Sequence, residues 1–111
     1  MTDTTDFGES EEINYFRETP VETVLGNHVF VLLQLAAVRL AETPPDLSGA
    51  QLVIDTLAAM ISAGGGRLGE HVDLYRSALA EVQQVYVRAA QSVSRASSDT
   101  LKREGETESS E

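Results

Sequence analysis

The stretch LGEHVDLYRSALAEVQQVYVRAAQSV, residues 68–93, decides the fold of this chain. Its apolar residues alternate in steps of four and three, and they are Leu68, Val72, Tyr75, Leu79, Val82, Tyr86, Ala89 and Val93. On an α-helix this spacing makes one continuous apolar stripe, of the kind that packs along another helix. Charged and polar residues lie off the stripe. We therefore predict a long amphipathic helix over about residues 69–94.

A second helix is predicted before it, over about residues 47–63. Its start follows Pro44 and Pro45, and either Asp46 or Ser48 can serve as the N-cap. Apolar residues then recur at helical spacing, and they are Leu52, Val53, Leu57, Met60 and Ile61. The glycine run at residues 64–66 ends this helix.

The first predicted helix covers about residues 20–42. Thr19 is the expected N-cap, with Pro20 at the first helical position and Glu22 three residues after the cap. Gly26 is a weak point inside it, costing about 1 kcal/mol relative to alanine. The segment VFVLLQLAAV, residues 29–38, is apolar nearly all round, and such a helix must be buried all round.

These elements predict an all-α fold, a three-helix antiparallel bundle of helices 20–42, 47–63 and 69–94. About 75 ordered residues without a disulfide make a marginal core. Together with the apolar first helix, this favours a symmetric homodimer with that helix at its centre. The alternative is a monomer in which the third helix covers the first well enough.

The ends of the chain differ in composition from the helical domain, residues 19–94. Residues 1–18 and 95–111 are acidic and poor in large apolar side chains, so we predict two disordered tails. Ile13, Tyr15 and Phe16 are an exception within the first tail. They are expected to pack on the domain or to stay disordered, with a short docking motif as the alternative.

The run GGGRLG, residues 64–69, satisfies the G-x-G-x-x-G pattern of dinucleotide-binding loops. That reading needs a strand before the glycines and an acidic residue about 20 residues after them, and the sequence offers neither. We predict instead a turn between two helices, with Gly64 in a left-handed conformation at the end of the second helix.

The composition limits the classes of function. The 111 residues carry a net charge of −10 and include no cysteine, which excludes disulfides and thiolate metal sites. Direct binding to nucleic acid is disfavoured, because phosphate contact needs a basic surface. The chain shows no signal peptide, and its most apolar segment is too short to span a bilayer. We expect a cytoplasmic protein that does not enter the membrane.

The segment DLSGAQLVIDTLAAMISAGGGRLGEHVDLYRSALAEVQQVYV, residues 46–87, resembles an uncharacterised bacterial family, the domain of unknown function 1844 family. The features that carry the resemblance are Asp46-Leu47 opening a helix, Ile54-Asp55 with Leu57, the glycine turn, and Tyr86-Val87. Gly69 stands where a Ser or Thr cap is usual in that family. The resemblance implies the fold, a bacterial origin and a hint of translation-linked work; it implies no activity, cofactor or catalytic residue.

Polar residues within the predicted helices are the remaining candidates for a site. His28 is expected to be hydrogen-bonded or to face the dimer partner, and His71 to face solvent, since no metal-binding spacing surrounds either. Asp55 interrupts the apolar run LVIDTLAAM; we expect it to pair with an arginine or to cap a helix, the alternative being a functional carboxylate. The candidate interaction or structural positions are Asp55, His28, Arg39, Arg76 and Arg88.

No set of acid, base and nucleophile is legible, so we predict no catalytic residue, metal or cofactor. The function predicted is that of a non-enzymatic helical interaction module, homodimeric, with an unknown protein partner. The alternative is a translation- or RNA-associated regulatory factor that uses its arginines; an enzyme is the least supported class.

Overall fold

The computed structural model describes residues 3–109, and all of its regular structure is helical. Helix α1 spans Asp3–Glu18, α2 spans Val21–Ala41, and α3 spans Leu47–Gly64. A short 3-10 helix, η1, covers Gly65–Leu68, and α4 spans Val72–Ser109. No strand occurs within residues 3–109, which confirms the all-α fold class.

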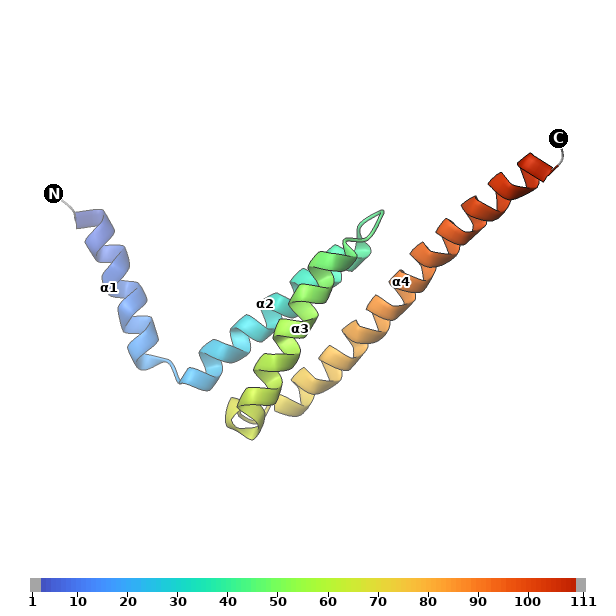
Figure 1. The fold of residues 1–111 in the computed structure, drawn as a ribbon. Helices are drawn as coiled ribbons and strands as arrows, with labels where there is room; N and C mark the ends of the chain where they lie inside the picture. Colours follow the sequence, from blue (N-terminus) through green and yellow to red (C-terminus); the bar gives the residue numbers. More distant parts are fainter. Residues whose placement is uncertain (1–2, 110–111) are drawn as a thin grey trace.

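The three predicted helices follow one another in alternating directions (Figure 1). Helices α2 and α3 form a hairpin, and α4 starts at η1 and runs back in the direction of α2. All three pairs among α2, α3 and α4 are in contact, and η1 contacts each of them. The order of the elements therefore follows the predicted one, with η1 inserted where a simple turn was expected.

The hydrophobic core lies where these helices meet η1. Val29 of α2 and Leu57 of α3 are fully buried. They form one cluster with residues from the later elements, which are Ile61, Leu68, Val72 and Tyr75. Farther along the hairpin Ala36 and Ala50 are also completely buried. Their short side chains let α2 and α3 approach closely.

The stripe on α4 is buried only in its first half. Val72 and Tyr75 are in the core, Leu79, Val82, Tyr86 and Ala89 are half-buried, and Val93 is exposed. The reason is length: 38 residues make a helix of about 57 Å, whereas the 18 residues of α3 extend for about 27 Å. The last part of α4 therefore projects beyond its partners (Figure 1).

Within the described residues both segments predicted as tails are helical, and their disorder stays a prediction. Helix α1 covers residues 3–18, and α4 continues through residue 95 to Ser109; residues 1–2 and 110–111 lie outside the described part. A helix satisfies its hydrogen bonds locally, but an isolated helix of about this length is only marginally stable in water. The side chains of residues 10–18 are all exposed, including Tyr15 and Phe16. Thus this segment adds nothing to the core.

The glycine turn has a different geometry from the predicted one. Gly64 has φ −77°, so the prediction of a left-handed Gly64 is wrong. The positive angles belong to Gly65, with φ 52°, and Gly69, with φ 99°. Gly64 is required for another reason, because a Cβ there would lie only 2.5 Å from Cγ of the buried Leu68.

The helix starts show which capping predictions hold. Asp46, rather than Ser48, is the N-cap of α3, and its side chain accepts a hydrogen bond from Gly49 N. The predicted Thr19 cap of α2 is wrong: the N-cap is Pro20, with no side-chain hydrogen bond. Gly26 of α2 faces the hydroxyl end of Tyr75, and a Cβ there would overlap the Tyr75 hydroxyl. The helix-weakening glycine therefore makes room for a core residue.

Candidate functional site

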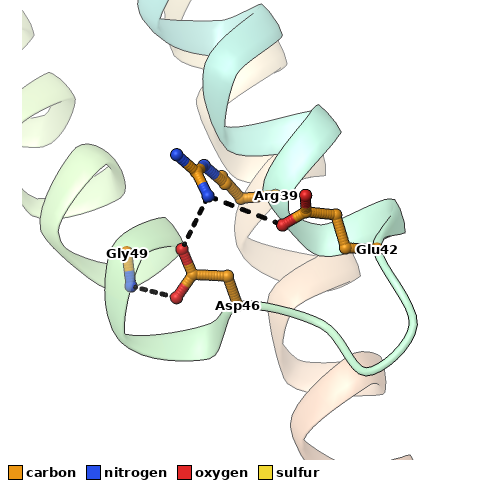
Figure 2. A network of polar contacts seen from close by, with 4 residues as sticks. All are labelled: Arg39, Glu42, Asp46 and Gly49. Atoms are coloured by element: carbon orange, nitrogen blue, oxygen red, sulfur yellow. Dashed lines mark hydrogen bonds and ion pairs between the residues drawn. The ribbon is translucent and has the colours of Figure 1, made fainter.

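Arg39 belongs to a polar network at the turn between α2 and α3 (Figure 2). Its Nη1 lies 3.4 Å from Asp46 Oδ2 and 3.7 Å from Glu42 Oε1. The other Asp46 oxygen, Oδ1, accepts a hydrogen bond of 3.0 Å from Gly49 N, and Asp46 N donates to Arg39 O at 3.0 Å. One carboxylate thus caps α3 and faces the last turn of α2, so this network holds the turn.

We expect Asp46→Ala to lower the free energy of unfolding by about 1 kcal/mol, since it leaves the first turn of α3 uncapped. Asp46→Asn keeps the capping acceptor and removes only the charge that faces the half-exposed Arg39, so its cost should be about 0.5 kcal/mol or less. Urea unfolding of the two variants checks this. An equal cost for both would mean that the ion pair, not the cap, stabilises the turn.

Asp55 is exposed and pairs with no arginine within the described residues, so the expected ion pair is wrong. Its Oδ1 accepts a hydrogen bond of 2.8 Å from Gln51 Nε2, one turn earlier in α3. Both side chains border a crevice of about 170 Å³ between α3 and α4, which Ile54, Gln83, Tyr86 and Val87 also line. The crevice is thus lined by one carboxylate, by amide groups and by apolar side chains. Its lining includes no second acid and no histidine.

The arginines are spread over the molecule rather than gathered on one face. Arg76 pairs with Asp73 at 3.2 Å, within the first turns of α4. Arg67 lies in η1, beyond the C-terminal end of α3, and donates to Ala63 O at 2.8 Å, whereas Arg39 lies at the turn before α3. Arg88 lies near the middle of α4, beside a shallow hollow. No basic surface forms from these residues.

A hollow lies between the start of α2 and the start of α4, and His71, the second of the two histidines, lines it. Its volume is about 410 Å³, and Glu22, Asn27, Glu70, His71 and Tyr75 are among its lining residues. His71 is exposed, as predicted. Within the described part of the chain no group of three His, Cys, Asp or Glu residues is placed to hold a metal ion.

The outer face of α2 carries exposed apolar side chains. The apolar residues Val21, Val31 and Val38 are 70%, 59% and 60% exposed, and Leu35 is also exposed. His28 lies on this side, with its Nδ1 2.8 Å from Val24 O. The apolar all-round character predicted full burial of this helix, but a single chain covers only one side of it.

Two described segments are long and apolar enough to cross a membrane, judged by length and composition alone. They are Val21–Ala41, with a mean hydropathy of 1.6, and Leu47–Leu68, with 1.3. Both segments are longer than the apolar run at residues 29–38, which is too short to span a bilayer. Core helices of soluble proteins have the same composition, so this observation does not place the chain in a membrane.

Together these features define the class of molecule: an all-helical chain with an uncovered apolar helix face and scattered polar side chains. Its sequence and structure match no known family model, no curated protein and no solved structure.

Proposed function

We propose that this chain is a non-enzymatic helical interaction module that acts as a homodimer. The observation that carries the proposal is the exposed apolar side of α2, whose opposite side forms the core. A helix with apolar residues on all sides is stable in water only when every side is covered. In the proposed dimer a second copy covers the outer side and completes the three-helix bundle of α2, α3 and α4.

The total surface supports association. The chain exposes 8072 Å², whereas a compact monomer of its mass exposes about 6,000 Å². Its radius of gyration is 21.3 Å, against about 13 Å for a compact chain of this length. Helix α1 and the end of α4 account for part of this excess. The remainder includes the apolar face of α2, which a specific interface of ordinary size would bury.

The alternative function, a translation- or RNA-associated factor, has less support. Direct binding of RNA needs cations on one face, and two of the arginines are paired with carboxylates at distant points of the fold. The net charge of −10 also disfavours direct binding of RNA. A regulatory factor that contacts its target through a protein partner would use the same α2 face.

Static light scattering of the full chain tests the proposal. We expect a mass of two chains, falling toward one chain on dilution, because an exposed apolar face of this extent favours self-association. A mass of 12.0 kDa at every concentration would contradict the homodimer.

A further inference from the structure

Six residues along α2 have a regular spacing; five of them are apolar, with Val24 half-buried, and the sixth is His28. The exposed Leu25 and Phe30 lie outside this series. Val21, Val24, His28, Val31, Leu35 and Val38 follow one another in steps of three, four, three, four and three. We call these six residues the α2 stripe. It has the alternation that brings two helices into register along a shared seam. The stripe on α4 has the same alternation, and its first half is used inside the core.

The α2 stripe lies on the side of the helix away from the core. Val29 and Ala36 of the same helix are 0% exposed, whereas Val31 and Val38, two residues further on in each case, are about 60% exposed. Successive residues turn by about 100° around a helix, so a step of two residues moves to the far side. Helix α2 thus carries two apolar faces, and only one of them has a partner among the described residues.

We propose that a second copy of this chain packs its α2 stripe against this one, with the two helices antiparallel. This inference rests on the homodimer proposed above and assigns its interface. The stripe is complementary to itself when reversed: Val21 lies opposite Val38, Val24 opposite Leu35, and His28 opposite Val31. A two-fold axis midway between His28 and Val31 generates these pairs, and such an axis makes a closed dimer.

The charge at the end of the stripe favours the antiparallel direction. The next position in the series, four residues after Val38, is Glu42. Parallel helices would place two Glu42 carboxylates together at the negative ends of both helices, which is unfavourable. Antiparallel helices about this axis separate the two Glu42 positions by 25 helical steps, about 38 Å. Opposite helix ends then lie side by side.

The borders of the stripe favour a protein partner over lipid. Helical geometry places Asn27 and Gln34 along one edge and Arg39 along the other. All three side chains are exposed. A helix face that enters lipid would be apolar across its whole width, whereas a narrow stripe with polar edges is typical of helix pairing.

The test places a charge in the stripe. Val31→Glu should weaken self-association roughly tenfold or more, because it buries a carboxylate near the centre of the seam. The matched control is Leu74→Glu on α4, which adds the same charge at a residue that is 54% exposed and outside the stripe. Sedimentation equilibrium measures association of the full chain, and circular dichroism verifies that each variant keeps its helices. We expect a monomer for Val31→Glu and a dimer for Leu74→Glu.

The possible results separate the two proposals. A wild-type monomer would overturn both the homodimer and its interface. A Val31→Glu variant that stays dimeric would overturn only the α2 stripe as the interface. If wild-type chain, but not Val31→Glu, bound to phosphatidylcholine vesicles and stayed monomeric without them, the stripe would be a lipid-binding face, and the inference would be wrong.

The direction of the helices can be tested by cross-linking, because the chain has no cysteine of its own. Val21→Cys chains are mixed with Val38→Cys chains and oxidised. Antiparallel pairing predicts that mixed disulfides between positions 21 and 38 form faster than those between identical positions. A majority of 21–21 and 38–38 products would overturn the antiparallel arrangement.

Discussion

Leu57→Ala is expected to lower the free energy of unfolding by about 2–5 kcal/mol. Leu57 is 0% exposed and lies in the core cluster with Val29, Ile61 and Tyr75. Removing its branched end takes away apolar contacts from α2, α3 and α4 at once, and it leaves a cavity that the neighbouring helices can fill only in part. In a domain of this size such a loss lowers the melting temperature by about 10 °C or more.

The control for this prediction is Leu52→Ala, the same chemical change five residues earlier in α3. Leu52 is 69% exposed, so its replacement should change the free energy of unfolding by about 0.5 kcal/mol or less. Thermal melts followed by circular dichroism check both variants. They are run at one protein concentration, since self-association makes the melting temperature depend on concentration. Equal losses for the two leucines would contradict the assigned core.

The inner faces of the helices could be predicted from sequence because they follow from periodicity alone. The stripe that begins at Leu68 and continues through Val72 and Tyr75 enters the core, and Leu57 and Ile61 of α3 meet it there. Two prolines and a run of glycines separate these helical segments, and this is enough to set the order of elements. Local spacing decides all of these features, so a single sequence contains them.

The polar contacts of the candidate residues could not be predicted in the same way. Arg39 lies near Asp46 because the chain turns between them, and Asp55 takes Gln51 as its partner because both point out of α3. An exposed ion pair contributes little free energy, so the residue pattern does not indicate which charges will pair. A spacing of four residues, as between Gln51 and Asp55, was the one available signal.

The composition of α2 predicts only in part how this helix is covered. An apolar helix predicts that something covers it, and the α2–α3–α4 contacts cover the side that carries Val29 and Ala36. Composition does not say whether the same chain or another molecule covers the opposite side. The three–four spacing of the α2 stripe, from Val21 to Val38, was present in the sequence and is the signal that favours a helix partner there.

Within the glycine turn, Gly65→Ala and Gly69→Ala are each expected to lower the free energy of unfolding by about 1–3 kcal/mol. Gly65 has φ 52° and ψ −138°, and Gly69 has φ 99° and ψ −168°, which are regions that residues with a Cβ rarely adopt. Neither position is crowded, so the loss would come from the backbone alone. The N–H groups of both residues close the turn, through hydrogen bonds to Ile61 O and Gly66 O respectively.

Gly66→Ala is the matched control, one residue from Gly65 in the same turn. Gly66 has no positive φ, and a Cβ there would have no neighbour within 4 Å. Its replacement should leave stability unchanged or raise it by about 0.4–1 kcal/mol, since alanine restricts the unfolded chain. Urea unfolding distinguishes the three variants. If Gly66→Ala cost as much as Gly69→Ala, the whole run would need the freedom of glycine, and the distinction between its positions would be wrong.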